Sequence, residues 1–124
     1  MSETFSALRI HRTDGVNHPE LEQLTVDDLT PGSVLVRVEY STINYKDALA
    51  VTGAAPIIRE YPCVAGIDLA GEVVESQDER FKPGEKVASL VGGLGETRDG
   101  GYAELARLDA GSLEVLPDAI DTRT

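Results

Sequence analysis

Residues 34–41 read VLVRVEYS, and their apolar and polar side chains alternate with a period close to two. This alternation follows the turn residues TPGS at 30–33 and predicts a β-strand with one buried face. Residues 5–12, FSALRIHR, repeat the pattern and predict a second strand. Further strands, short and rich in valine and leucine, are predicted at residues 21–29, 69–76, 86–91, 102–108 and 113–116. A chain dominated by short strands favours a mainly β fold, a small barrel or sandwich.

One short helix is predicted at residues 44–51, NYKDALAV. Asn44 can cap its N-terminus, Asp47 stands where a capping box needs an acid, and Gly53 ends the helix. Two turns of helix are not stable alone, so packing must hold this segment in place. Residues 116–124 are predicted to be a polar connection leading out of the domain.

Composition excludes several classes of protein. Eleven Lys and Arg against 22 Asp and Glu give a net charge of −11 in 124 residues, and 41% of the residues are hydrophobic, which suits one packed domain. An acidic chain without a basic stripe argues against binding to nucleic acid or to an anionic membrane. No apolar run approaches the roughly 18–20 residues of a membrane span, and residues 1–15 lack the features of a signal peptide. We therefore expect a cytoplasmic domain.

Metal ligands are sparse in the sequence. Cys63 is the single cysteine, which excludes an internal disulfide and any multi-cysteine metal site. His11 and His18 are seven residues apart without recognisable co-ligands, so both are expected to be exposed or loosely packed. The sequence thus predicts no bound metal.

Three segments together resemble a known family. They are YSTINYKD at 40–47, YPCVAGIDLAGEVV at 61–74, and FKPGEKV at 81–87 followed by GGYAE at 100–104. In this order and spacing they resemble the N-terminal, GroES-like domain of the medium-chain dehydrogenase/reductase superfamily. They are most similar to its YhdH/YhfP group of quinone oxidoreductases, which includes acrylyl-CoA reductases. The resemblance implies a GroES-like, partly open barrel with one or two short helices.

Members of the family are longer than this chain and carry a Rossmann domain inserted after a segment like residues 116–117. The glycine-rich residues 92–95 lie between predicted strands rather than at a strand-to-helix turn, so they do not form a phosphate loop. We therefore expect residues 1–124 to be the GroES-like portion of a longer protein, with the Rossmann cofactor domain after residue 124. Such a portion should be inactive alone and should expose apolar surface where its partner domain packs.

The resemblance implies an NADPH-dependent reductase that acts, as a homodimer, on an activated alkene such as acrylyl-CoA. Zinc-dependent relatives have a cysteine where this chain has Asn44, and a His-Glu pair at Ile67 and Asp68. An amide and an isoleucine cannot replace a thiolate and an imidazole on a tetrahedral ion, so the enzyme is expected to work without zinc. An NADPH:quinone oxidoreductase is the enzymatic alternative. A stand-alone GroES-like binding or assembly module is the alternative from another class.

Asn44, Tyr45 and Asp47 are the main candidate site residues, because they lie where a strand end leads into a helix. The resemblance implies that Tyr45 lies beside the nicotinamide of NADPH, with Asn44 and Asp47 lining the same corner. The alternative is structural: Asn44 and Asp47 form a capping box, and Tyr45 is a half-buried anchor. Both interpretations can hold for Asn44.

Three further residues have weaker patterns. Asp68 either orients a neighbour or substrate group, or simply bonds backbone amides at a strand edge. Arg98, in the glycine-rich loop at 92–101, either contacts an anionic substrate or is a solvated loop charge. Cys63 follows Pro62 in an apolar setting, which favours a buried structural thiol over a reactive one.

Overall fold

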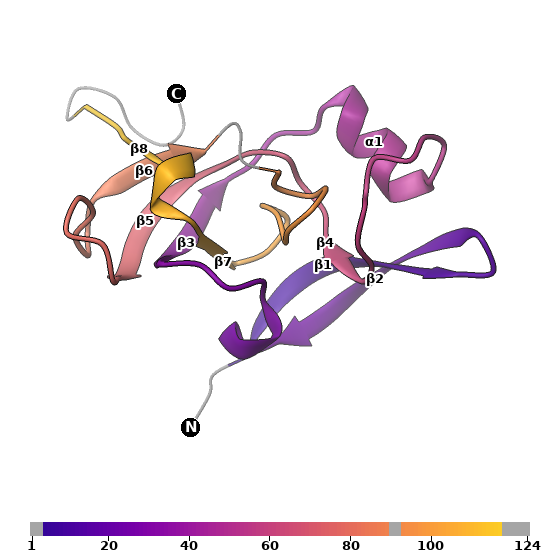
Figure 1. Ribbon diagram of the computed structural model, residues 1–124, viewed down its shortest axis with the longest axis horizontal. Coiled ribbons are helices and arrows are strands. Elements are labelled where there is room, and N and C mark those ends of the chain that lie inside the picture. Colours follow the sequence, from indigo (N-terminus) through magenta and orange to yellow (C-terminus); the bar gives the residue numbers. More distant parts are fainter. Residues whose placement is uncertain (1–3, 90–92, 118–124) are drawn as a thin grey trace.

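The computed structural model describes residues 4–89 and 93–117, and in these residues it is built mainly of strands (Figure 1). The elements are β1 (Phe5–Thr13), β2 (Val16–Leu24), the 3-10 helix η1 (Val26–Asp28), β3 (Val34–Tyr40), α1 (Tyr45–Thr52), β4 (Cys63–Val64), β5 (Leu69–Ser76), β6 (Lys86–Ser89), β7 (Leu105–Leu108), the 3-10 helix η2 (Ala110–Ser112) and β8 (Glu114–Val115). The strands form one sheet in the order β2-β1-β4 and another in the order β7-β3-β5-β6-β8. The predicted mainly β fold is confirmed.

The hairpin of β1 and β2 differs from the sequence prediction. Asp14 and Gly15 both have positive φ, 52° and 77°, and form a two-residue turn that pairs Thr13 directly with Val16. The partner strand predicted at residues 21–29 is therefore wrong: it runs over Val16–Leu24 and is followed by η1. Alternation did not reveal residues 16–20, because β2 is an edge strand that buries little on either face.

The five-stranded sheet carries the largest core. Apolar side chains of β3 and β5 alternate into it, as predicted, together with residues of β6, β7 and the loops; its members are Val34, Val36, Leu69, Val73, Phe81, Val87, Leu94, Ala106, Leu108, Ala110 and Leu113. The strand predicted at 86–91 is observed as β6, and its residues 90 and 91 lie outside the described residues.

Residues 102–108 join the two sheets. Their first part bonds to β1, with Leu8 N donating to Tyr102 O at 2.8 Å and Glu104 N donating to Ser6 O at 3.0 Å. Their second part, β7, pairs with β3. The sequence predicted one strand over this whole stretch, whereas the chain changes partner within it. This crossing closes the two sheets into a partly open barrel.

Helix α1 lies against the three-stranded sheet, away from β6 and β8 (Figure 1). Its Ala50 is buried with Ile10 of β1 and with Cys63, and the Asn17 amide of β2 donates to the Ala50 carbonyl at 2.9 Å. Gly53 ends the helix with a left-handed φ of 77°, as predicted. The short helix is thus held by packing.

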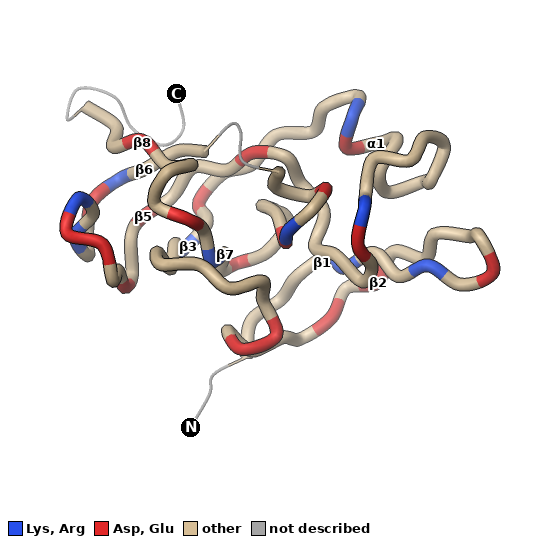
Figure 2. Tube along the Cα trace, viewed as in Figure 1, with Lys and Arg blue, Asp and Glu red and all other residues tan. Residues whose placement is uncertain are grey.

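Acidic residues are spread along the whole trace rather than gathered in one patch (Figure 2). Among the described residues, no helix is long and apolar enough to cross a membrane. The glycine-rich loop was predicted at residues 92–101 and the C-terminal connection at residues 116–124. Gly92 of the loop and residues 118–124 of the connection lie outside the described part of the chain.

Candidate functional site

Three segments meet beside the N-terminus of α1: the link 41–44 between β3 and α1, residues 64–68, and residues 99–102. Gly100 N donates to Val64 O at 2.9 Å, and Tyr102 N donates to Ala65 O at 2.9 Å. A Cβ at Gly100 would lie 2.0 Å from the carbonyl oxygen of Gly66, so only glycine allows this approach. The close contact brings together the side chains of Thr42, Asn44, Asp47, Asp68 and Tyr102, hereafter the Asn44 cluster.

Asp47 is the buried centre of the Asn44 cluster, with 1% of its surface exposed. Its Oδ1 accepts a hydrogen bond from Ile67 N at 3.0 Å, and its Oδ2 accepts from Asn44 N and Asn44 Nδ2, both at 3.0 Å. The capping box of Asn44 and Asp47 is present, which confirms the structural interpretation of this pair. The bond to Ile67 goes further, because it ties the start of the helix to a loop twenty residues away.

Asp68 bonds a backbone amide, as its structural interpretation predicted, and it also contacts two neighbouring side chains. Its Oδ1 accepts from Thr42 N at 3.1 Å, and its Oδ2 accepts from Thr42 Oγ1 at 2.6 Å and from Asn44 Nδ2 at 3.3 Å. It therefore bonds a backbone amide and also orients a neighbour. The Asn44 amide group faces oxygen atoms of two carboxylates and of Thr42, which fixes its orientation.

Tyr102 completes the Asn44 cluster and, like Thr42, was not singled out from the sequence. Its hydroxyl donates to the Thr42 carbonyl at 2.9 Å. Burial, followed by the negative charges of Asp47 and Asp68, raises the pKa of the Tyr102 phenol. The phenol therefore remains a hydrogen-bond donor at neutral pH. The only sequence signal for it was its place in the segment GGYAE.

Tyr45 lies at the edge of the Asn44 cluster and is 80% exposed, so it is not a half-buried anchor. Ile43 is 89% exposed, and Tyr40 is also exposed. We call these three side chains the exposed patch. Three large apolar side chains within six residues of chain are thus open to solvent.

Arg98 does not belong to the Asn44 cluster. Its side chain is only 12% exposed, and it donates to Asp109 Oδ2 at 3.0 Å and to the carbonyl oxygens of Pro31 and Arg107 at 2.7 and 2.9 Å. The expectation of a solvated loop charge is therefore wrong. The guanidinium therefore joins the loop to β7 and to the segment before β3.

Cys63 is buried, as predicted, and burial raises the pKa of its thiol to about 12, with the nearby charge of Asp99 adding to the effect. Asp99, which was not singled out from the sequence, is buried too. Its Oδ1 accepts from Val64 N and its Oδ2 from Thr30 N, both at 2.9 Å. Asp99 thus fastens the loop to β4 and to the segment before β3.

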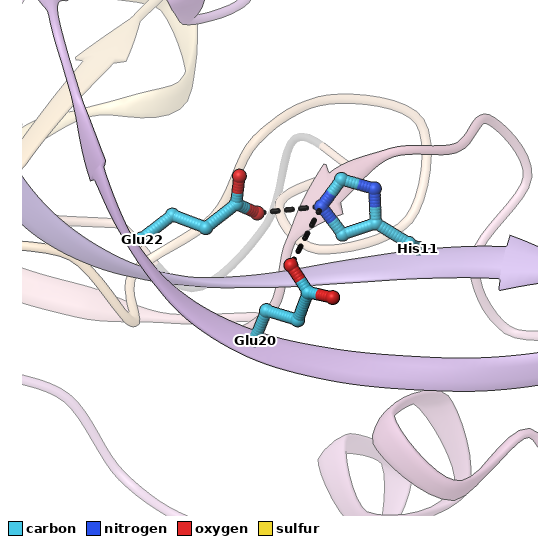
Figure 3. Close-up of side chains that lie close together, drawn as sticks. All are labelled: His11, Glu20 and Glu22. Atoms are coloured by element: carbon cyan, nitrogen blue, oxygen red, sulfur yellow. Dashed lines mark hydrogen bonds and ion pairs between the residues drawn. The ribbon is translucent and has the colours of Figure 1, made fainter.

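His11 lies beside two carboxylates, although the sequence offered no recognisable co-ligands for it. The β1–β2 register places Glu22 Oε2 at 2.5 Å and Glu20 Oε2 at 3.9 Å from His11 Nε2 (Figure 3). Spacing along the chain did not reveal the two carboxylates, because the hairpin turn was not recognised.

Comparison with known protein families identifies the class of proteins to which this fold belongs. Residues 30–118 match the family described as the alcohol dehydrogenase GroES-like domain, and the chain belongs to this family. The GroES-like fold and the family resemblance are thereby confirmed.

Among its relatives, the acrylyl-CoA reductase AcuI of Ruegeria pomeroyi is 44% identical over 96% of this chain and 37% of its own length. YhfP of Bacillus subtilis, whose name assigns it to the quinone oxidoreductases, is 39% identical over 99% of this chain and 37% of its own length. The solved yhdH oxidoreductase of Salmonella enterica, in complex with NADP, has a TM-score of 0.92 and 42% identity over 95% of this chain and 36% of its own. The chain therefore spans just over a third of the length of these relatives.

Proposed function

We propose that this chain is the GroES-like part of an NADPH-dependent reductase that acts, without zinc, on an activated alkene of the acrylyl-CoA type. The observation that carries the proposal is the rigid Asn44 cluster with the exposed Tyr45 at its edge. The oxidoreductase relatives support it, since their similarity extends over nearly the whole chain. None of the relatives reported supports the alternative of a stand-alone assembly module.

We place a nucleotide-binding domain after residue 124 of the complete protein. The relatives support this, because each extends well beyond the part that this chain matches. The exposed patch is the surface that such a domain would cover, together with the nicotinamide end of its cofactor. The formal charges of residues 40–67, which are Lys46, Asp47, Arg59 and Glu60, sum to zero and would tolerate an anionic cofactor.

The residues of the Asn44 cluster do not fit a catalytic zinc ion. Asn44 turns its amide donor toward oxygen atoms, and Ile67 offers no side-chain ligand. Asp68 stands where zinc-dependent relatives have a glutamate, but its carboxylate already accepts hydrogen bonds from Thr42 and Asn44. A tetrahedral ion needs three protein ligands here, so we derive no step through a metal.

NADPH, when bound, supplies the hydride that reduces the alkene. The chain's own residues would then act in three ways. Tyr45 packs its ring beside the nicotinamide, and its hydroxyl donates a hydrogen bond to the thioester carbonyl, which takes up negative charge during the reaction. Ile43 helps to exclude water. The Asn44 cluster acts through these residues, because it holds the link that carries them in one conformation.

The test uses the full-length protein with NADPH, following the loss of reduced cofactor with acrylyl-CoA and with quinones as acceptors. We expect kcat/KM for acrylyl-CoA to exceed that for quinones by about 100-fold, and activity to survive a zinc chelator. A preference for quinones would support the second candidate, which the similarity to YhfP favours. Inactivation by the chelator would refute zinc independence.

Tyr45 has a matched control in Tyr61, which is partly buried against the core cluster of Ile10 and Ala50 and has the Arg12 guanidinium over its ring. Tyr45→Phe keeps the ring and removes the hydroxyl, so kcat should fall about 100-fold while the KM for NADPH stays unchanged. Tyr45→Ala should also raise the KM for NADPH. Tyr61→Phe should change neither constant. Equal effects of Tyr45→Phe and Tyr61→Phe would contradict the assigned role.

A further inference from the structure

A second group of ligand-type side chains lies on the β1–β2 hairpin: His11, Glu20 and Glu22, hereafter the hairpin triad (Figure 3). One nitrogen or oxygen atom from each residue lies within 4.8 Å of the others. His11 Nε2 is between the two carboxylates, 2.5 Å from Glu22 Oε2 and 3.9 Å from Glu20 Oε2. All three side chains remain accessible to solvent.

The hairpin presents the triad on one face. His18 stands opposite His11 and Glu20 opposite Arg9, and side chains two apart on a strand share a face. Asn17 belongs to the other face, where its amide reaches the Ala50 carbonyl of α1. The triad therefore lies on the side of the hairpin turned away from α1, separate from the Asn44 cluster.

Two carboxylates directed at one imidazole nitrogen need a positive charge between them. Arg9 gives partial compensation only, because its Nη1 lies 4.0 Å from the other oxygen of Glu22. The triad thus brings one imidazole nitrogen and two carboxylate oxygens close to one point.

We propose that the hairpin triad binds a divalent transition ion of the Zn²⁺ type. One imidazole nitrogen with two carboxylates suits such an ion better than Mg²⁺ or Ca²⁺, which prefer oxygen ligands alone. Ligands of a tetrahedral zinc are about 3.3 Å apart, so the 2.5 Å and 3.9 Å separations need only side-chain rotation to fit. Solvent would fill the remaining position. The ion should bridge both strands of the hairpin, because His11 lies on β1 and both glutamates lie on β2.

The experiment titrates Zn²⁺ into the purified, metal-free protein at pH 7.5 by calorimetry, with Co²⁺ absorption as a second readout of a nitrogen- and oxygen-ligated tetrahedral site. We expect one site that depends on the triad, with Kd below about 100 µM, and no heat from Mg²⁺. Binding should weaken at least about tenfold at pH 5.5, because protons compete for the ligands. His11→Asn, Glu20→Gln and Glu22→Gln should each weaken it about tenfold or more.

The chain supplies matched controls. His18→Asn removes the other histidine of the same hairpin, and Glu79→Gln removes an exposed acid in another loop; both should leave binding unchanged. Glu20 is 60% exposed, so its variant should fold, and thermal unfolding without metal verifies this for each variant. Zn²⁺ binding that ignores all three triad variants would overturn the proposal. Equal loss in His11→Asn and His18→Asn would assign the site to the histidine pair instead, and no binding at 100 µM would also refute it.

Discussion

Asp47→Ala should be among the most destabilising single substitutions in this chain. The Asp47 carboxylate accepts hydrogen bonds from Ile67 N, Asn44 N and Asn44 Nδ2, each at 3.0 Å, and is 1% exposed. Alanine leaves the two backbone donors without their acceptor, at about 1–3 kcal/mol each. The capping box includes the Asn44 N bond already counted, so its loss adds no separate cost. We therefore expect the free energy of unfolding to fall by about 2–6 kcal/mol, a large part of the 5–15 kcal/mol typical of a domain.

Urea unfolding followed by circular dichroism measures the change, with the slope of the transition checked for constancy. The matched control is Asp27→Ala, which removes an exposed aspartate in η1 and should change stability by less than about 0.5 kcal/mol. A second control, Asp47→Asn, keeps the size and one acceptor and should fall between the two. If Asp47→Ala loses no more stability than Asp27→Ala, the carboxylate does not hold the link, and the argument for a rigid Asn44 cluster fails.

Gly100→Ala should destabilise the protein by about 3 kcal/mol, because the new Cβ would lie 2.0 Å from a backbone carbonyl oxygen, whereas Gly111→Ala meets nothing within 4 Å and should be neutral in the same urea assay. Cys63 should react with iodoacetamide at pH 8 about 100-fold more slowly in the native protein than in urea, since its thiol is buried with a pKa of about 12; equal rates would contradict that burial. Hydrogen bonds from the Arg80 side chain, then its backbone, lower the pKa of Asp78 to about 2. The stability that this pair provides is therefore present above pH ~4 and is lost as pH falls through about 2. Arg80→Gln should raise the pKa, measured by NMR titration, toward the ordinary ~3.9 without reaching it, because the backbone hydrogen bond from residue 80 remains.

Most of the fold could be predicted from local patterns. Alternation located β1, β3 and β5, and the signals at Asn44 and Gly53 located α1 within one residue. The hairpin partner of β1 was missed because β2 is an exposed edge strand, although the Asp14-Gly15 pair is a turn signal that would have found it. The strand predicted at 102–108 was too long for a different reason: two partner strands share that segment.

The candidate site was predictable only in part. Asn44 and Asp47 are three residues apart, and capping follows from local helix geometry. Thr42 and Tyr102 were missed because their bonds join residues 60 positions apart, which no local pattern encodes. Arg98 was misjudged because a loop arginine resembles a solvated charge until the carbonyl groups around it are known.

The order of residues along this chain was enough to determine its strand periodicity, the cap and stop of its helix, its excess of acid, and its family. Those properties depend on neighbours within a few positions, or on composition, which a sequence states directly. The tertiary structure alone decided that the Asp47 carboxylate would bond Ile67, that Tyr45 would be exposed, and that Glu20 and Glu22 would face His11. These depend on which segments approach one another in space, and that is set by strand register and glycine contacts rather than by distance along the chain.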